Sequence, residues 1–318
     1  MANFLVTGGL GFVGSHLTEK LYDAGHDVTV LDNLSNGHQS NLSHLRNKIT
    51  LYISNVEQIK STIFSKKFDG IFHLATAPRS SSLSDPFQDI ETNCKGMISI
   101  LELAKKDNAK VVFTSNSGIY GSKDNTSSID ENSINNPTTP YDANKLVSEF
   151  YCKIYYNIYN VHSAIVRFAT VYGERQRVNE SLNWRPLVAT FVKNVLGHEN
   201  VTINGDGMQT RDLLYVKDAV QGVIKAMESS SNSAEIFLLS TNTETSVNKV
   251  LESIENIVGA KANVIHSDFL KGDIMRMRYS YSKAKNNFSF EPQYSLEQGI
   301  TRMIEYTREN QGKGNFSH

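Results

Sequence analysis

The sequence predicts an α/β protein built on a doubly wound parallel sheet, and three observations support this. Short apolar runs alternate with helical patterns through the first half of the chain. The apolar runs are continuous and rich in β-branched residues, as parallel strands covered on both faces require. The chain has 318 residues, enough for two domains or for one large α/β unit with a substantial core.

The predicted elements begin with an apolar strand at 4–7, which a helix over 14–24 follows until the turn at Gly25. Strand–helix alternation at this spacing is typical of a doubly wound sheet. The segment 247–258 is amphipathic, with apolar residues at helical spacing. Further strands are expected at 28–31, 51–53, 70–74, 110–114, 162–168 and 235–239, and further helices at 93–106, 141–159, 186–196, 218–228 and 247–258.

Composition excludes several classes of protein. The 32 Lys+Arg nearly balance the 33 Asp+Glu, so the chain has no overall positive charge that would favour nucleic acid or an anionic membrane as a partner. Two cysteines, Cys94 and Cys152, are too few for a disulfide framework or a Cys-rich zinc site, and we expect no metal centre. No stretch approaches the ~18 apolar residues of a membrane span. The N-terminus has no basic segment before its apolar run, so we expect a soluble, cytoplasmic protein.

The most informative motif is a glycine-rich turn between the first strand and the first helix. Gly8, Gly11 and Gly14 have the spacing that lets a backbone approach a pyrophosphate at a helix N-terminus. Asp32 ends the next strand, where a carboxylate accepts hydrogen bonds from ribose hydroxyls and repels a 2′-phosphate. The pattern therefore predicts NAD rather than NADP, and a purely structural glycine turn is the alternative.

A second motif, Tyr141-Asp-Ala-Asn-Lys145, falls in a predicted helix. Residues four apart share a helix face, so the Tyr141 phenol and the Lys145 ammonium can approach one point. A free Tyr has a pKa near ~10 and is a poor base at neutral pH. A neighbouring ammonium and the positive nicotinamide ring would both stabilise the phenolate and lower that pKa, which makes Tyr141 a candidate proton acceptor. A solvated helix face is the alternative for this motif taken alone.

With these motifs the chain resembles the extended short-chain dehydrogenase/reductase superfamily, and within it the NAD-dependent nucleotide-sugar epimerases and dehydratases typified by UDP-glucose 4-epimerase. The matching segments occur in the family's order across nearly the whole chain. They are 7–16, 32–37, 72–75, Asn93, 115–121, Tyr141 with Lys145, 167–168, 171–173 and 205–212.

The resemblance implies a Rossmann-type NAD-binding domain over 1–170 and a smaller C-terminal α/β domain, mainly 171–318, that binds a nucleotide sugar. Later segments such as 205–240 are expected to return partly to the first domain. The residues that match the family's NAD contacts are Gly8, Gly11, Phe12, Val13, Gly14, Asp32, Asn33, Leu34, Ser35, Asn36, Gly37, Asn55, Val56, Leu74, Ala75, Thr76, Asn93, Tyr141, Lys145 and Ala169. Those that match its substrate contacts are Asn116, Tyr141, Thr170, Asn183, Arg211 and Asp273, with Arg211 on the diphosphate.

The chain departs from the family pattern at the residue four before Tyr120. Most members have Ser or Thr there, hydrogen-bonded to the reacting sugar hydroxyl, whereas this chain has Asn116. An amide donates and accepts hydrogen bonds but does not relay a proton as a hydroxyl does. A shift of the strand end by one residue would bring Ser115 or Ser117 into the site, so Ser115 is a second candidate beside Asn116. Leu270 likewise stands where an arginine is common.

These observations favour a nucleotide-sugar epimerase that acts on C4 of UDP-glucose and UDP-galactose, or of their N-acetyl forms, through a transient 4-keto intermediate. The related dehydratases and decarboxylases resemble one another in carrying a carboxylate just after the catalytic Ser/Thr, where this chain has Ser117 and Gly118. A net dehydrogenase or reductase, a dehydratase and a non-catalytic NAD-binding sensor are the alternatives. Helix pairing is frequent in the family, so we expect a homodimer formed through 93–106 and 141–159.

Overall fold

The structure is a computed structural model that describes residues 1–59, 64–122, 128–178, 185–230, 233–269 and 274–311. A seven-stranded sheet with the strand order β11-β6-β5-β4-β1-β2-β3 forms its larger part. Every pairing in this sheet is parallel, as the continuous apolar runs predict. The strands are β1 (Asn3–Thr7), β2 (Asp27–Asp32), β3 (Thr50–Ile53), β4 (Gly70–His73), β5 (Lys110–Asn116), β6 (Ser163–Phe168) and β11 (Ser233–Leu239).

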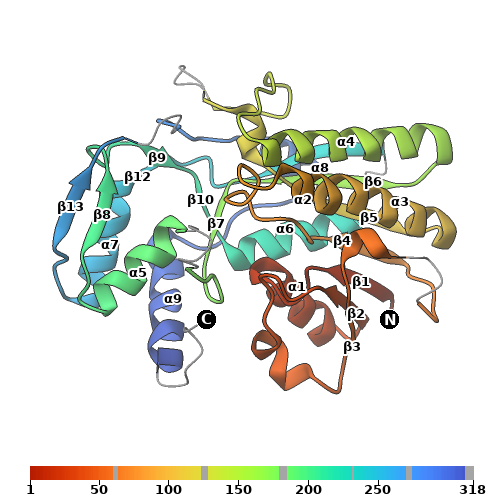
Figure 1. Ribbon diagram of the computed structural model, residues 1–318, viewed down its shortest axis with the longest axis horizontal. Coiled ribbons are helices and arrows are strands. Elements are labelled where there is room, and N and C mark those ends of the chain that lie inside the picture. Colours follow the sequence, from red (N-terminus) through yellow and green to blue (C-terminus); the bar gives the residue numbers. More distant parts are fainter. Residues whose placement is uncertain (60–63, 123–127, 179–184, 231–232, 270–273, 312–318) are drawn as a thin grey trace.

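Helices cover both faces of the sheet (Figure 1). One face packs against α1 (Phe12–Asp23), α6 (Val216–Glu228) and α8 (Ser282–Phe288), and the other against α3 (Gly96–Asp107) and α4 (Pro140–Tyr159). Successive strand residues enter different cores, since Val112 contacts the first set of helices and Val111 the second. This two-sided burial confirms the doubly wound fold.

The predicted helix over 93–106 differs from what forms. A short helix, α2 (Pro86–Ile90), leads into a π-helical turn over Glu91–Lys95, and α3 begins only at Gly96. The π turn makes Thr92 and Asn93 buried residues at its centre. Its wider winding turns Asn93 toward the end of β4, where its side-chain oxygen accepts a hydrogen bond from Thr76.

The remaining elements form a smaller layer beside the sheet (Figure 1). Three short pairs of strands lie there: β7 (Thr170–Tyr172) with β10 (Leu213–Tyr215), β8 (Val201–Asn204) with β13 (Val264–Ser267), and β9 (Thr210–Arg211) with β12 (Thr245–Ser246). The helices α5 (Leu187–Leu196), α7 (Val247–Val258) and α9 (Leu296–Gln311) pack on a third apolar core that includes Phe191, Ile254 and Ile304.

The strand β11 comes from the second half of the chain and pairs with β6 at one edge of the large sheet. The chain therefore crosses to the smaller layer after β6 and returns before α7. At the opposite edge, β3 exposes Leu51 and Ile53, which explains why its apolar run is the weakest of the set. Within the described ranges no helix combines the length and apolar character needed to cross a membrane.

Candidate cofactor and substrate site

The glycine turn joins β1 to α1 and is built so that only glycine fits at its centre. Gly8 has φ +69°, in the left-handed region. A Cβ atom at Gly14 would overlap the carbonyl oxygen of Gly8. Gly11 is the N-cap residue of α1, and no side chain among the described residues caps this helix end. The first-turn N–H groups of α1 are thus left for an external anion, and the cradle fits the pyrophosphate of a dinucleotide.

Asp32 ends β2 beside this turn and is nearly buried. Its two carboxylate oxygens accept hydrogen bonds from the backbone N–H groups of Leu10 (3.0 Å) and Leu34 (2.8 Å). Burial raises the pKa of Asp32, and these two N–H groups act in the opposite direction. Each oxygen keeps a further lone pair, so the carboxylate can accept hydrogen bonds from a ribose as expected for NAD.

A cavity of about 680 Å³ runs along the carboxyl ends of the strands, from Asp32 past the glycine turn to Tyr141. Most of the predicted residues line it. They are Gly8, Gly11, Phe12, Val13, Gly14, Asp32, Asn33, Ser35, Asn36, Gly37, Asn55, Val56, Leu74, Ala75, Thr76, Ser115, Asn116, Tyr141, Lys145, Ala169 and Thr170.

Three predicted residues, Leu34, Asn93 and Arg211, do not line this cavity. Asn93 lies behind its wall and accepts a 2.8 Å hydrogen bond from Thr76, which does line it. Arg211 donates from Nη1 to the carbonyl oxygens of Thr210 (2.8 Å) and Ile274 (2.7 Å), and Ile274 lines the cavity. Two further candidates, Asn183 and Asp273, lie outside the described residues, as does Leu270.

Tyr141 and Lys145 lie in the first turns of α4 and meet at the inner end of the cavity. Pro140 and the N-cap Thr139, whose hydroxyl accepts from the Asp142 N–H, start the helix here. The buried Lys145 Nζ donates to the carbonyl oxygen of Thr114 at 3.0 Å and lies 5.7 Å from the centroid of the Tyr141 ring.

Lys145 alone does not bring the pKa of Tyr141 into the range of a base at neutral pH. Burial raises the pKa of Tyr141 to about 12, with Thr76 and Arg79 acting in the opposite direction. Burial also lowers the pKa of Lys145 to about 8. The chain by itself therefore holds the phenol protonated at neutral pH, and further positive charge is required at the cavity to make Tyr141 a base.

Adjacent residues at the end of β5 have different surroundings. The Ser115 hydroxyl donates a 2.6 Å hydrogen bond to Glu149, which also forms a buried bidentate ion pair with Arg167. The side-chain nitrogen of Asn116 is buried, lies at the cavity, and has no partner in the described part of the chain. The side-chain nitrogen of Asn116, rather than the Ser115 hydroxyl, is thus the donor available to a ligand.

Arg79 was not predicted as a site residue, yet it follows β4 in a Ser-rich segment and lines the same cavity as Tyr141. Its Nη2 donates a 3.0 Å hydrogen bond to Asp142. The available signal was its position just after the predicted contacts Leu74–Thr76, at the carboxyl end of a strand. Gln88 and Gln176 also line the cavity and were likewise missed.

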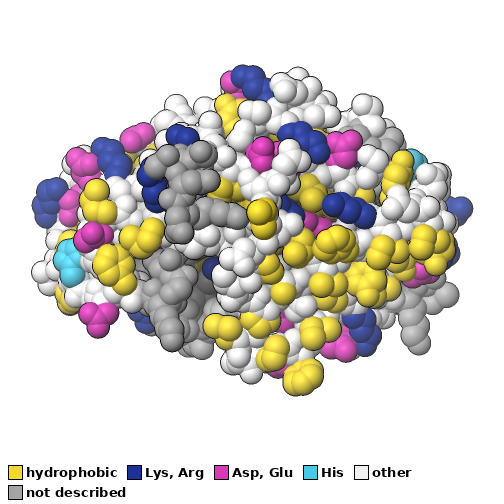
Figure 2. All heavy atoms as spheres, turned by 90° about the horizontal axis from the view of Figure 1, so that it is seen from above, with side chains coloured by type: hydrophobic (Ala, Val, Ile, Leu, Met, Phe, Trp, Pro, Cys, Tyr) yellow, Lys and Arg dark blue, Asp and Glu magenta, His cyan; other side chains and the backbone are white. Residues whose placement is uncertain are grey.

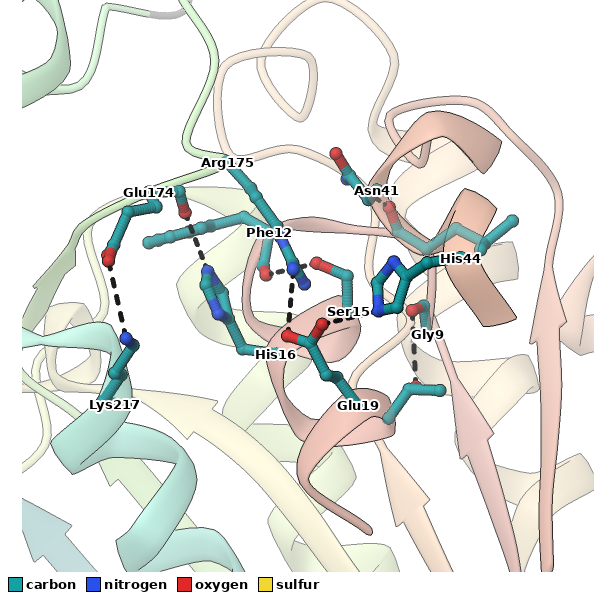
Figure 3. A network of polar contacts seen from close by, with 12 residues as sticks. Gly9, Phe12, Ser15, His16, Glu19, Asn41, His44, Glu174, Arg175 and Lys217 are labelled. Carbon is teal, nitrogen blue, oxygen red and sulfur yellow. Dashed lines mark hydrogen bonds and ion pairs between the residues drawn. The ribbon is translucent and has the colours of Figure 1, made fainter. Parts of the chain in front are cut away.

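A polar network ties α1 to the segment after β7 (Figure 3). His16 donates from Nε2 to the carbonyl oxygen of Glu174 at 2.9 Å, and Arg175 forms an ion pair with Glu19 at 2.9 Å. Burial lowers the pKa of His16 to about 4, so this ring is neutral at pH 7. The network fixes the helix that carries the glycine turn against the smaller layer.

Comparison with known proteins agrees with this geometry. A family model described as the NAD-dependent epimerase/dehydratase family matches residues 4–239. A putative UDP-glucose 4-epimerase from Methanocaldococcus jannaschii is 32% identical, covering 96% of this chain and 98% of that protein. A UDP-glucuronic acid decarboxylase from Danio rerio is 31% identical, over 95% of this chain and 72% of that protein. The crystal structure of a Thermotoga maritima UDP-glucose 4-epimerase with UDP-glucose has a TM-score of 0.90 and 34% identity, covering 97% and 99% of the two chains.

Proposed function

Because the chain belongs to the NAD-dependent epimerase/dehydratase family, we propose that it is an NAD-dependent 4-epimerase of a nucleotide sugar. UDP-glucose and UDP-galactose, or their N-acetyl forms, are its proposed substrates, interconverted through a transient 4-keto sugar. The main support for this proposal is that Tyr141, Lys145 and Asn116 line the same cavity as the glycine turn. The similar proteins named UDP-glucose 4-epimerase support the choice of sugar.

Each residue has a defined task in the proposed reaction. The glycine turn and Asp32 would hold NAD, which when bound would supply the hydride chemistry at C4, from one face of the sugar and back to the other. Tyr141 takes the proton of the C4 hydroxyl and later gives it back. Lys145 adds positive charge at the inner end of the cavity, and the Asn116 amide donates a hydrogen bond to the C4 oxygen. Arg211 and Thr170 are proposed contacts of the diphosphate.

The decarboxylase among the relatives makes elimination or decarboxylation the second candidate reaction. The residues that follow Asn116, namely Ser117 and Gly118, carry no carboxylate, and this favours epimerisation. A Cβ atom at Gly118 would lie 2.5 Å from the Asp142 carboxylate, so the space beside Gly118 is already filled. A larger acidic side chain at position 118 would not fit without displacing Asp142.

The test is to incubate the purified protein with UDP-glucose, UDP-galactose and the two N-acetyl forms, and to follow each by proton NMR. Interconversion at C4 without net NADH release supports the proposal, and Tyr141→Phe is the inactive control. Stoichiometric NADH release would indicate a dehydrogenase, and a dehydrated or decarboxylated product the second candidate. No conversion of any nucleotide sugar by protein with bound NAD would favour the non-catalytic sensor.

We also propose that the protein is a homodimer formed through α4. Val147, Phe150, Ile154 and Ile158 are exposed at helical spacing along this helix. Phe87 and Ile90 of α2 expose further apolar surface beside them, and Figure 2 shows this hydrophobic band on the face above the sheet. An apolar stripe on one helix is complementary to itself about a two-fold axis, which favours a second copy as its occupant.

A further inference from the structure

Asp142 is a fully buried carboxylate directly after the proposed proton acceptor Tyr141. Its Oδ2 accepts hydrogen bonds from the Thr139 hydroxyl at 2.7 Å and from Arg79 at 3.0 Å. Its Oδ1 is buried and has no partner among the residues that the structure describes. Burying an ionised carboxylate costs free energy unless a cation compensates its charge. Arg79 is the cation in contact with Asp142.

Arg79 lies in the segment after β4, at the side of the cavity that faces α4. Its side chain is half-exposed, and its one hydrogen bond to a described residue is the contact with Asp142. The ion pair therefore joins two elements at the inner end of the cavity: the segment that supplies Leu74–Thr76 and the helix turn that supplies Tyr141. From this position the ion pair is better placed to influence the protonation of Tyr141 than to stabilise the fold as a whole.

We propose that Arg79 and Asp142 are a pair of positioning residues, in which the guanidinium compensates the buried carboxylate so that Tyr141 can give up its proton. The inference rests on the proposed function only in taking Tyr141 as the proton acceptor. Without Arg79, the negative charge of Asp142 would act on the Tyr141 phenolate uncompensated. Without the charge of Asp142, Arg79 would favour the phenolate more strongly.

In the part of the chain that the structure describes, the charged and polar groups that act on Tyr141 come from three elements. On α4 these are Asp142 and Lys145, on α2 the group is Asp89, and in the segment after β4 they are Arg79 and Thr76. The Asp142 and Asp89 carboxylates raise the pKa of Tyr141, whereas the Arg79 charge and the Thr76 side chain lower it. Arg79 and Asp142 thus act on Tyr141 with opposite signs.

The test is a double-mutant cycle on the NAD-bound protein with Arg79→Gln, Asp142→Asn and the double variant. Two quantities are measured: the ultraviolet absorbance of the Tyr141 phenolate, as the difference from Tyr141→Phe, and the acid limb of kcat/KM against pH. An opposite charge at this range shifts a pKa by roughly one unit or more. We expect Arg79→Gln to raise by about one pH unit both the midpoint of the phenolate titration and that of the acid limb. At a pH below the acid limb, kcat/KM should then be about tenfold lower than in wild type. Asp142→Asn should lower both midpoints, and in the double variant both midpoints should lie close to those of wild type.

Two controls separate positioning from structural damage. Arg79→Lys keeps the charge and should titrate as wild type. Lys249→Gln removes the cation of an exposed pair with Glu252 on α7 and should shift neither titration. Shifts of the same sign in both single variants, or an unshifted phenolate titration, would overturn the inference. Because that titration needs no sugar, opposed shifts in a protein that converts no nucleotide sugar would reject the proposed function alone.

Discussion

The Ser115 hydroxyl donates a 2.6 Å hydrogen bond to the buried Glu149 carboxylate, so the hydroxyl is engaged by the core although Ser115 lines the cavity. Since Glu149 keeps its bidentate pair with Arg167 when this hydroxyl is removed, Ser115→Ala should cost about 1 kcal/mol of unfolding free energy. Its kcat should stay within about twofold of wild type, because the hydroxyl does not serve the substrate. Urea denaturation and steady-state kinetics check both values.

Asn116→Ala should show the reverse behaviour. The side-chain nitrogen of Asn116 has no protein partner in the described ranges, so removal of the side chain should leave folding almost unchanged. Loss of a preorganised donor to the reacting oxygen should lower kcat by about 10²-fold. Asn116→Ser, which restores a donor, should recover part of the loss. Equal activity of Asn116→Ala and wild type would remove Asn116 from the mechanism.

Gly14→Ala should abolish NAD binding. The added methyl group would overlap the Gly8 carbonyl oxygen and push α1 away from β1, which opens the cradle for the pyrophosphate. Gly25→Ala is the matched control, since it adds a methyl group in open space at φ +81° and costs only about 1 kcal/mol of backbone strain. Calorimetric titration with NAD measures both. Retained affinity in Gly14→Ala would contradict the cradle.

His16 should make the protein less stable in acid. Its folded pKa of about 4 lies below the ordinary 6.5, so below pH 6.5 the unfolded chain binds a proton that the folded chain does not. The free energy of unfolding should therefore fall by about 2 kcal/mol between pH 6.5 and pH 5 through this residue. His16→Gln keeps a donor to Glu174 and removes the titration. Denaturation at the two pH values should show a smaller fall in this variant, while His73, which is buried in both proteins, cancels in the difference.

Ile154→Glu should convert the proposed dimer to a monomer. The side chain is 44% exposed in the middle of the α4 stripe, where two charges would face each other across a two-fold axis. Ile265→Glu is matched in exposure, at 45%, and lies on β13 away from the stripe. Sedimentation velocity should give a smaller particle for the first variant alone. A wild-type monomer at micromolar concentration would reject the dimer.

The strands of the sheet and the glycine turn were predictable because their signals are local. Val111 and Val112 are both apolar since each faces a helix layer, and Gly14 is required by one contact with its own turn. The orientation of Ser115 was not predictable, because it depends on Glu149 from another element. The π turn before α3 could not be predicted either, because it differs from an α-helix only in the register of its backbone hydrogen bonds and needs no particular residue types. The contact of Arg79 with Asp142 could not be predicted from residue spacing, because the two residues lie far apart in the chain.

The return of β11 to the edge of β6 has a consequence for biosynthesis. When β6 leaves the ribosome its outer backbone groups have no neighbour, and the strand that covers them is completed roughly 70 residues later, several seconds at about 5–20 residues per second. During that interval the nascent chain presents an open, apolar strand edge, the kind of surface that pairs with other chains. Slower synthesis lengthens the exposure, so soluble yield should depend on translation rate and on chaperones that bind nascent chains. A fragment cut after residue 170 would keep this edge open permanently.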